Sequence, residues 1–519
     1  MDLSKLASGL LQGAEEIVRS DEACLDTAKT AEEAARYLAR NLDERKELVD
    51  LEHEGYTLFD ALSLSWTRLA QSFDPSQAAS NDTKGWASED SRIQLASALG
   101  KLERNLIAGI QPFQDIAEQH EEAIRALIFN ITTFVRIEDE RFFTLHAILA
   151  QLLCNLISPS SGQAGADRLA DKYLRLYLSG GRNEDIIIRL LDSRDSKTNN
   201  ATLHLLNNVV RGDRNRLQLL LSDIGVRWLA KILNRMDEWV EAQNGLFELG
   251  ASIFNQMIDH SLHPKLFDLL SDPGEVITPS QTVLLKILDS HLSSSRSSAP
   301  SPSPHIFLIG LFHNLARYSK ISIDSKADDP RLPKVFEGLI LVTEGLSAVG
   351  LAVQSRKDQH RPSEGLEGDA ELAWNMKDVE GGVVKPSIEL LRSLDTFFPR
   401  LNPRVQSQST GATIMPISDD LKPFSNLKRN IVQLLGILTF EDTLVGDQVR
   451  EAEGIQLILG MTEIDENNPY LREHALLCVR NLMLNNPANQ AIVSQMNPVG
   501  VLSPENGELL PVPDKMKKK

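Results

Sequence analysis

The sequence predicts an all-α fold, an armadillo/HEAT-like α-solenoid (superhelix) in which short helices stack side by side. Three observations lead to this fold class. Apolar residues recur at helical spacing, and the alternation typical of strands is absent. Aromatic residues make up 5% of the chain against 42% hydrophobic residues, so Leu, Ala, Ile and Val must fill the core. A unit of helix, asparagine, polar turn, helix and glycine also recurs.

Apolar stripes identify the single helices. In "YLREHALLCVRNLM" one side of a helix collects Leu471, Ala475, Cys478, Val479 and Leu482. The segment "FSNLKRNIVQLLGIL" repeats the design with Phe424, Leu427, Ile431, Leu434, Leu435 and Leu438. Most of residues 3–292 follows the same pattern. A helix of about a dozen residues is marginal alone in water, so each stripe is expected to be covered by neighbouring helices.

Asparagines follow apolar helix ends at four places, which are Asn155, Asn208, Asn314 and Asn481. A glycine starts a later helix at Gly225 and again at Gly454. Asn208 precedes Gly225 by 17 positions, and Ile437 precedes Gly454 by 17, so Ile437 occupies an asparagine slot. Ile437 and Asn481 are 44 positions apart. This spacing falls within the roughly 40–47 residues of armadillo and HEAT repeats.

Breaks in the helical pattern predict the organisation of the chain. A Ser/Pro-rich stretch, a polar Gly-containing stretch and a third polar stretch interrupt it. We expect helical repeats at 1–292, a Ser/Pro-rich loop at 293–304, further repeats at 305–400 with a mobile loop at 355–387, a linker at 401–420, C-terminal repeats at 421–503 and a tail at 504–519.

Charge and cysteine content exclude several classes of protein. The formal net charge is −18 and no basic stripe reverses it, so nucleic acid is not an expected partner. Cys24, Cys154 and Cys478 lie far apart, which fits a reducing compartment, and we expect a cytoplasmic protein. No stretch resembles a signal peptide or the roughly 20 apolar residues that span a bilayer, so no membrane insertion is expected.

Motifs for catalysis and for cofactors are absent from the sequence. There is no H-E-x-x-H, C-x-x-C, G-x-S-x-G or phosphate-binding glycine loop. His260 and His263 could share a helix face beside Asp259, but no further ligand lies near, so they are interpreted as surface histidines. Cys478 lies on a packed stripe and is expected in the core. The sequence therefore predicts no enzyme, no metal and no cofactor.

The recurring asparagines are the candidate partner-binding residues. On the last striped helix, Asn481 shares a flank with His474 and Leu477. An amide at the edge of a packed stripe can hold the extended backbone of a partner, because it both donates and accepts. The predicted binding residues are thus Asn155, Asn208, Asn314, His474, Leu477 and Asn481. Alternatively, each asparagine caps a helix or bonds within its own turn, and capping is the stronger interpretation for Asn486 and Asn489.

The span "NPYLREHALLCVRNLMLNNPANQAIV" closely resembles the C-terminal domain of ataxin-10 proteins, of the fungal type. The preceding "NLKRNIVQLLGILTF" and "VREAEGIQLILGM" resemble the earlier half of that domain, in the same order and at similar spacing. The resemblance covers about residues 417–500. Where the family commonly has Gly-Asn-Leu, this chain has Gly436-Ile437-Leu438.

The expected function is a non-catalytic scaffold that binds other proteins through the concave face of its helix stack. The ataxin-10 resemblance implies a cytoplasmic protein associated with the regulation of cytokinesis and cell division. Two alternatives stay open. One is a nuclear import adaptor of the armadillo type, which needs repeated Trp-x-x-x-Asn pairs that this chain lacks. The other is an armadillo-type exchange factor or regulator of small GTPases.

Overall fold

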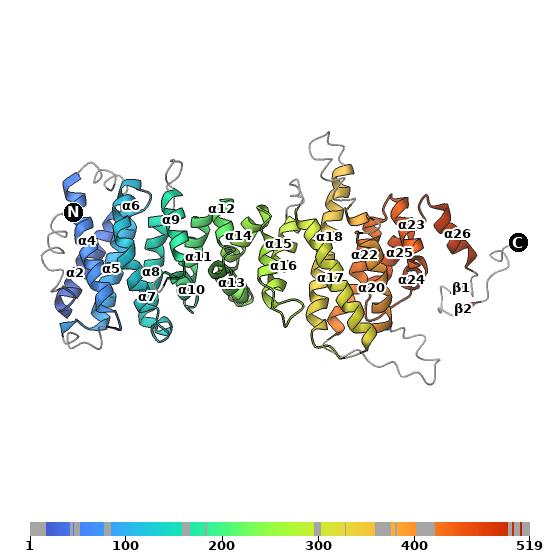
Figure 1. The fold of residues 1–519 in the computed structure, drawn as a ribbon, viewed down its shortest axis with the longest axis horizontal. Helices are drawn as coiled ribbons and strands as arrows, with labels where there is room; N and C mark the ends of the chain where they lie inside the picture. Colours follow the sequence, from blue (N-terminus) through green and yellow to red (C-terminus); the bar gives the residue numbers. More distant parts are fainter. Residues whose placement is uncertain are drawn as a thin grey trace. The chain divides into compact units, whose positions relative to one another are not determined.

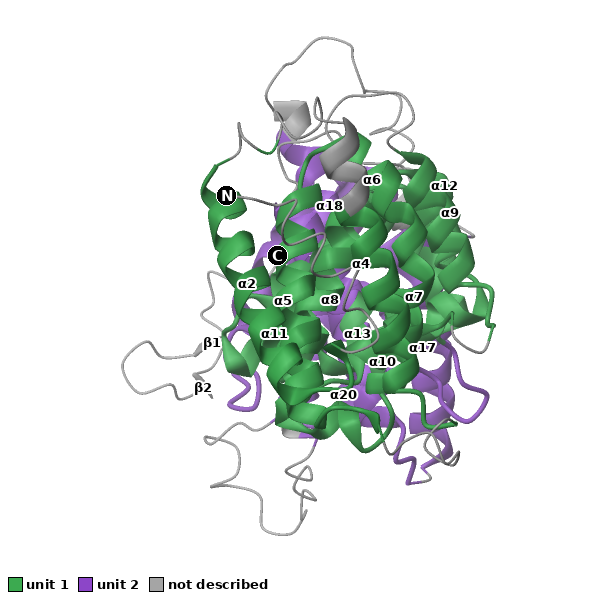
Figure 2. Ribbon diagram, turned by 90° about the vertical axis from the view of Figure 1, so that its left-hand side faces the viewer, with its two compact units in different colours: residues 1–270, 279–284 green, residues 271–278, 285–519 purple. Residues whose placement is uncertain are grey.

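The structure is a computed structural model that describes residues 17–41, 45, 52–76, 85–157, 167–181, 184–294, 303–326, 328–358, 375–378, 381–400, 421–496, 501–502 and 509–510. The chain forms two compact units, coloured separately in Figure 2. Unit 1 comprises residues 1–270 and 279–284, and unit 2 comprises residues 271–278 and 285–519.

Unit 1 is built from helices throughout its described part (Figure 1). Its elements are α2 (Asp21–Arg40), α4 (Glu52–Ser72), α5 (Glu89–Ile107), α6 (Gln111–Ala117), η3 (Glu118–His120), α7 (Glu121–Ile131), η4 (Arg136–Glu138), α8 (Glu140–Ile157), α9 (Asp167–Tyr177), α10 (Ile186–Leu191), α11 (Ser196–Val210), α12 (Arg214–Leu219), α13 (Asp223–Ala242), α14 (Leu246–Asp259) and α15 (His263–Leu269).

The helices of unit 1 stack in two rows. In the first row α2 packs on α5, α5 on α8, α8 on α11 and α11 on α14. In the second row α4 packs on α7, α7 on α10 and α10 on α13. Helices α6, α9 and α12 each precede one helix of the second row and one of the first, which gives successive three-helix units of the armadillo kind. Each helix therefore buries its stripe against the helices before and after it in the row.

Side chains at the helix starts explain where the elements begin. Asp195, Asp213 and Ser222 cap α11, α12 and α13 by accepting from the backbone N–H three residues later. Gly225, one of the two landmark glycines, lies in the first turn of α13, and a Cβ there would come within 2.4 Å of the Leu220 carbonyl oxygen. Position 225 therefore requires glycine, because α12 and α13 approach each other too closely for a Cβ.

Unit 2 continues with helices and ends with a short pair of strands. Its elements are α16 (Pro279–Ser294, of which 279–284 belong to unit 1), α17 (Ser303–Ser325), α18 (Leu332–Asp358), α20 (Val384–Phe397), η5 (Lys422–Ser425), α22 (Asn426–Leu438), α23 (Thr443–Glu451), α24 (Gly454–Gly460), α25 (Leu471–Met483), α26 (Pro487–Gln495), β1 (Val501–Leu502) and β2 (Leu509–Leu510).

One row of helices organises unit 2. Helix α18 packs on α22 and α22 packs on α25, while α17 packs on both α18 and α20. Gly454, the second landmark glycine, begins α24, and a Cβ at this position would lie 2.6 Å from Ile388 Cδ1 of α20. The stacked rows in both units confirm the predicted all-α, armadillo-like fold class.

The last repeat is joined to its neighbours by buried amides. Asn486 caps α26 by accepting from the Asn489 backbone N–H at 3.1 Å, which confirms the capping interpretation for Asn486. The capping interpretation is wrong for Asn489, whose side chain is fully buried and whose Nδ2 donates to the carbonyls of Gly446 and Leu482 at 3.1 and 3.0 Å. A Cβ on Gly446 would lie 3.2 Å from both amide nitrogens. The polar turn "LNNPANQ" therefore packs α26 closely against α23.

Several predicted boundaries differ in detail from the structure. Helix α16 continues to Ser294 and α17 starts at Ser303, so only 295–302 of the Ser/Pro-rich stretch lie outside the described residues. Helix α18 reaches Asp358 and α20 starts at Val384, so both ends of the predicted 355–387 loop are helical. The predicted linker at 401–420 lies outside the described residues. The two-residue strands β1 and β2 pair antiparallel within the region that was expected to lack strands.

One helix passes the length and composition test for a membrane span, contrary to the sequence-based expectation. Residues 332–355 of α18 form 24 residues with an apolar stretch that is 67% buried within the protein. Its buried side includes Val335, Phe336, Leu339, Val342 and Leu346. Packing against α17 and α22 accounts for this apolar composition, because the core helix of a folded stack needs the same residues.

Candidate partner-binding surface

Three of the predicted asparagines lie in the helix rows, and their amide nitrogens bond across to the preceding helix. Asn155 Nδ2 of α8 donates to the Arg104 carbonyl of α5 at 3.0 Å. Asn481 Nδ2 of α25 donates to the Gly436 carbonyl of α22 at 2.9 Å. Asn208 Nδ2 of α11 lies 3.1 Å from Cys154 Sγ of α8. These amides link successive repeats.

Asn105 shows the same geometry one repeat earlier, although it was not singled out in the sequence. Its Nδ2 donates to the Ala35 carbonyl of α2 at 2.9 Å. A helix carbonyl already bonded within its helix has a second lone pair, which an amide of the neighbouring helix can use. Such a bond contributes about 1 kcal/mol net when it is formed in a partly buried site. Neither a cap nor a bond within the same turn describes these amides.

The other predicted residues lie at the surface. Asn314 of α17 is exposed. On α25, Leu477 is 49% exposed and His474 is half-buried, whereas Asn481 on the same flank is only 8% exposed. Their role in partner binding stays a prediction. For Asn155, Asn208 and Asn481 a partner would have the amide oxygen and the second N–H to bind, because one N–H of each amide is engaged within the fold.

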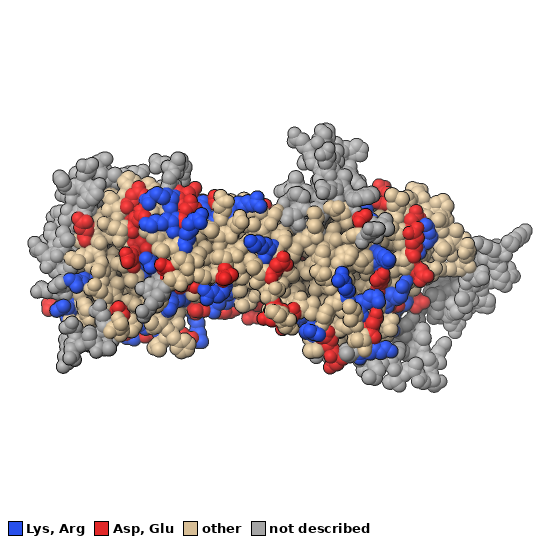
Figure 3. Space-filling view, viewed as in Figure 1, with Lys and Arg blue, Asp and Glu red and all other residues tan. Residues whose placement is uncertain are grey.

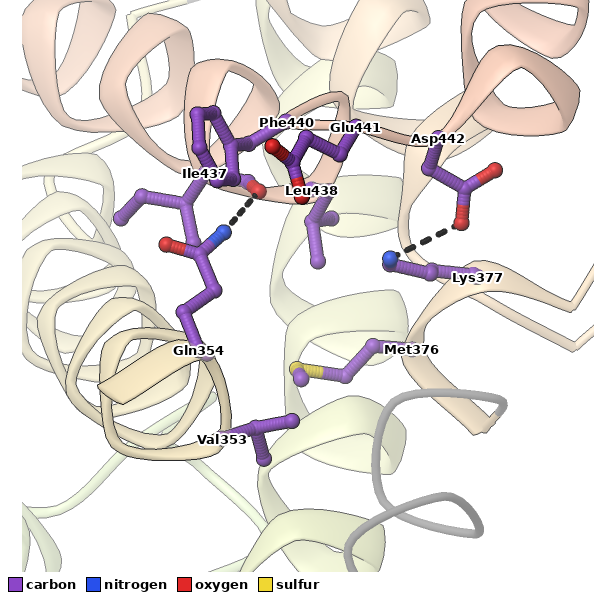
Figure 4. A pocket seen from close by; sticks show the side chains of 10 residues that line it. Val353, Gln354, Met376, Lys377, Ile437, Leu438, Phe440, Glu441 and Asp442 are labelled. Carbon is purple, nitrogen blue, oxygen red and sulfur yellow. Dashed lines mark hydrogen bonds and ion pairs between the residues drawn. The ribbon is translucent and has the colours of Figure 1, made fainter. Parts of the chain in front are cut away.

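At Ile437, which occupies an asparagine slot of the repeat, another side chain makes the hydrogen bond between the two helices. Gln354 Nε2 of α18 donates to the Ile437 carbonyl at 2.6 Å, so the bond between the two helices is made from the opposite side (Figure 4). The residues lie at a cavity of about 130 Å³ whose apolar wall includes Val353 and Met376. A glutamine on the preceding helix thus replaces the asparagine of the usual slot.

An ion pair closes one side of this cavity. Lys377 Nζ lies 2.9 Å from Asp442 Oδ2, as drawn in Figure 4. This hydrogen bond from Lys377, together with the backbone N–H groups at the start of α23, lowers the pKa of Asp442 despite its partial burial. Asp442 also caps α23 by accepting from the Leu444 and Val445 backbone N–H groups. The pair therefore fixes residues 375–378 onto the start of α23.

A half-exposed face runs along the α18–α22–α25 row of unit 2, and we name it the row surface. Its residues are Glu344, Leu351, Arg429, Gln433, His474 and Leu477. Leu351 is 40% exposed and Leu477 is 49% exposed. In the sequence, the α22 members Arg429 and Gln433, followed by Ile437, recur at four-residue intervals beside the buried stripe. This spacing was the available signal for a second, half-exposed stripe.

A hollow of about 220 Å³ lies in the row surface between α16, α18 and α22. Ala348 and Leu351 form its apolar part, and Asn430 and Gln433 contribute amides. Two carboxylates, Asp289 and Glu344, also line it, and partial burial raises the pKa of each. For Glu344 the charge of Asp289 raises the pKa further, while a hydrogen bond from Asn430 opposes the shift. The hollow combines apolar walls with hydrogen-bond acceptors.

His474 contributes an uncharged ring to the row surface at neutral pH. Partial burial lowers its pKa, and the nearby Arg429 guanidinium lowers it further. The neutral imidazole offers one donor and one acceptor. Arg472, Glu473 and Arg480 of α25 are exposed charged residues. The flank of α25 that carries His474 and Leu477 is therefore the side with the mixed apolar and polar character that suits a partner.

The cysteines and histidines occupy structural positions. Cys24, Cys154 and Cys478 are buried, and burial raises the pKa of Cys478 to about 12, so this thiol is protonated in the core as predicted. His263 is 1% exposed, which corrects its interpretation as a surface residue. Among the described residues, no group of three or more His, Cys, Asp or Glu side chains is placed to hold a metal ion.

Charges on the face of the molecule in Figure 3 alternate in sign. Over the α6–α9 part of unit 1, Lys and Arg lie among Asp and Glu. Arg168 and Lys172 of α9 pair with Glu118 at 2.7 Å each, and Arg168 also reaches Asp115. Mixed charges of this kind neutralise one another locally, as is usual on a solvated surface.

The C-terminal helices match a known family. Residues 427–511 match the model of the spinocerebellar ataxia type 10 protein domain. An ataxin-10 homolog of Kluyveromyces lactis is 41% identical over 73 residues, which are 14% of each chain. The ataxin-10 homolog of Schizosaccharomyces pombe is 29% identical over 131 residues, 24% of this chain and 30% of the relative. Ataxin-10 of Xenopus tropicalis is 33% identical over 93 residues, 18% and 19% of the two chains.

Solved structures show weaker similarity. A chain of the SYS-1/POP-1 crystal complex is 12% identical with a TM-score of 0.36, covering 98% of this chain and 80% of that chain. A chain from a structure on the interaction of cadherin with beta-catenin is 12% identical with a TM-score of 0.28, covering 92% and 86%. TM-scores of this size do not establish a common fold.

The match to the relatives is confined to the end of the chain, since it spans between 14% and 30% of the length of the three relatives described above. It includes α22 to α26, β1 and β2, and thus two of the three helices of the row surface. The fungal relatives agree with the resemblance to the fungal type. The C-terminal part of this chain, residues 427–511, is therefore similar to the spinocerebellar ataxia type 10 protein domain.

Proposed function

We propose that the protein is a non-catalytic armadillo-repeat scaffold that binds other proteins through the row surface of unit 2. The observation that carries this proposal is the combination on one row of helices of Leu351, 40% exposed, with the hollow that it lines, and of Leu477, 49% exposed, with His474. Large exposed apolar side chains beside satisfied polar groups are typical of binding faces. The helices beneath are packed into a stack, so the face is already in place before a partner arrives.

We further propose a cytoplasmic protein that takes part in the regulation of cytokinesis. The support for this step is the ataxin-10 domain at residues 427–511, and the rest of the chain adds none. Depleting the protein in its native cell should then increase the fraction of cells with two nuclei. A fluorescent fusion should appear outside the nucleus. Normal division after depletion would remove the cytokinesis role while leaving the scaffold role open.

Affinity purification from the native cell, followed by mass spectrometry, tests the scaffold. We expect Leu477→Ser to lose partners that the wild-type chain retains, because it removes an exposed apolar contact from the row surface. Leu269→Ser is the matched control, since Leu269 is a 41% exposed leucine of unit 1. If both variants retain the same partners as wild type, the row surface is not the binding face.

Two further measurements separate the scaffold from its alternatives. Acceleration of nucleotide release from small GTPases by the purified chain would favour an exchange factor and contradict a scaffold role alone. Tight binding of a basic nuclear-localisation peptide would favour an import adaptor. We expect no tight binding of the peptide, because the sequence lacks the repeated Trp-x-x-x-Asn pairs that such a groove needs. We also expect no acceleration of nucleotide release.

A further inference from the structure

The turn between α7 and α8 exposes two large apolar side chains. Phe134 is 90% exposed and Val135 is 77% exposed. Among the described residues of unit 1, the other exposed large apolar side chains are Leu25, Leu64, Val240 and Leu269, which lie between 36% and 52%. The turn joins the lower ends of α7 and α8 in Figure 1. An almost fully exposed phenylalanine contributes nothing to the packing of unit 1.

The base of this turn is held firmly by buried polar contacts. Thr132 is 4% exposed, and Arg189 Nη1 donates to its carbonyl at 3.2 Å. The fully buried His146 donates from Nε2 to the Ile131 carbonyl at 3.0 Å. The Ile137 backbone N–H donates to the Thr133 carbonyl at 2.9 Å and closes the turn. The backbone is therefore fixed on both sides of Phe134.

Arg136 adds a further anchor directly after the exposed pair. Its Nη1 donates to the carbonyls of Asn130 and Phe73, at 3.0 and 3.1 Å. Its guanidinium lies 5.6 Å from the Phe73 ring centre and 5.7 Å from that of Phe142. With the turn held in one shape, insertion of its tip into a pocket orders little additional backbone, which favours binding.

We propose that Phe134 and Val135 form an anchor that inserts into an apolar pocket of a partner protein. This is a second interaction site, on unit 1, and it does not depend on the row surface of unit 2. A projecting pair of side chains fits a concave partner. Exposed aromatic anchors that fill a pocket are the residues that commonly dominate protein–protein binding.

The surrounding charges indicate the rim of that pocket. The ion-pair network next to the tip contains one carboxylate more than arginines: Glu89, Asp90, Glu138 and Asp139 against Arg136, Arg141 and Arg194. Glu140, at the start of α8, adds an exposed carboxylate. All three arginines are already paired with carboxylates. The rim of the partner pocket should thus carry basic residues. The same excess of negative charge opposes insertion into an anionic lipid surface.

A second copy of this chain is a poorer occupant than a concave partner. A phenylalanine buries roughly 150–250 Å². Stable interfaces bury about 800 Å² per partner, so two tips meeting one another would fall far short. A pocket that encloses the tip and touches the charged rim reaches a larger area.

Photo-crosslinking at position 134 tests the proposal. The probe is the full chain with p-benzoylphenylalanine in place of Phe134, irradiated in an extract of its native cell. We expect one predominant protein adduct. That protein is then purified, and its Kd for the wild-type chain should be weakened about tenfold or more by Phe134→Ser. Val240→Ser, at a 52% exposed site of α13, should leave the Kd unchanged.

Three controls make the outcome decisive. Melting of Phe134→Ser should match wild type, because the side chain is 90% exposed, and a lower melting temperature would give Phe134 a structural role instead. Adducts only with a second copy of the chain, or binding to phosphatidylserine vesicles that Phe134→Ser abolishes, would overturn the proposal. A Kd unaffected by Phe134→Ser would do so as well. Partners lost with Leu477→Ser but retained with Phe134→Ser would belong to the row surface, so failure at one site leaves the other testable.

Discussion

Asn481 illustrates how one side chain can hold two repeats together. It is 8% exposed, and its Nδ2 donates to the Gly436 carbonyl of the preceding helix at 2.9 Å. We therefore expect Asn481→Ala to lower the free energy of unfolding by about 1–2 kcal/mol. Urea unfolding measures this change. Leu477→Ser, at a 49% exposed site of the same helix, should stay within about 0.5 kcal/mol of wild type. Equal stability of wild type and Asn481→Ala would mean that the amide is free for a partner.

His146 makes the stability of unit 1 depend on pH. Burial lowers its pKa from 6.5 to about 4, and its Nε2 donates to the Ile131 carbonyl. Between these two pH values the unfolded chain binds a proton at His146 that the folded chain does not. The stabilisation is therefore fully present above pH 6.5 and is lost as the pH falls towards 4, by about 3 kcal/mol in total.

The His146→Gln variant isolates this effect. Glutamine retains a donor for the Ile131 carbonyl but does not titrate. Urea unfolding at pH 7.5, 5.5 and 4.5 should show a smaller loss of stability for the variant than for wild type. Parallel pH profiles of the two proteins would show that His146 does not contribute.

At the scale of elements, we expect opposite changes in stability when two different glycines are replaced by alanine. A Cβ on Gly225 would come within 2.4 Å of the Leu220 carbonyl oxygen, at the junction of α12 and α13. A Cβ on Gly310, an exposed position of α17, meets nothing within 4 Å. We expect Gly225→Ala to destabilise by about 1–3 kcal/mol. We expect Gly310→Ala to stabilise by up to about 1 kcal/mol, because alanine favours helix.

Thermal unfolding followed by circular dichroism gives the sign of both changes. Amide hydrogen exchange then shows whether the loss in Gly225→Ala is located in α12 and α13. A melting temperature raised by Gly225→Ala would mean that these two helices are not in close contact.

At the scale of the whole molecule, the last repeat should unfold without disturbing distant ones. Leu482 of α25 is 1% exposed and lies in the stripe against α22. Leu482→Asp buries an unpaired charge and should cost several kcal/mol in the C-terminal repeats. Helices in a stack contact only their neighbours, so the effect should fade with distance along the row.

Hydrogen exchange measured along the chain tests this prediction. Protection in α22, α25 and α26 should fall in Leu482→Asp, while protection in α5 and α8 of unit 1 stays at the wild-type level. Unchanged protection in α25 would show that the stripe is wrongly assigned. Loss of protection in α5 and α8 would show that the two units unfold together.

Local patterns in the sequence were sufficient to predict the helices and the structural roles of several single residues. Leu471, Ala475, Cys478 and Leu482 of the predicted stripe are buried, while Val479 is only partly buried. Helical periodicity predicts these positions because it depends only on residues close in the chain. Gly225 and Gly454 were recognised as repeat landmarks, and Asn486 as a cap, for the same reason. Of the residues of the row surface, only His474 and Leu477 were predicted from the sequence as binding residues.

The sequence alone thus determined that short amphipathic helices must stack, and it located the segment that is similar to the ataxin-10 domain. Only the tertiary structure decided what each polar side chain bonds. The acceptor of Asn481 lies 45 positions away and that of Gln354 lies 83 positions away, so the pairing follows from how the helices pack. Likewise, the 90% exposure of Phe134 follows from the contacts that fix its turn, which join residues far apart in the chain.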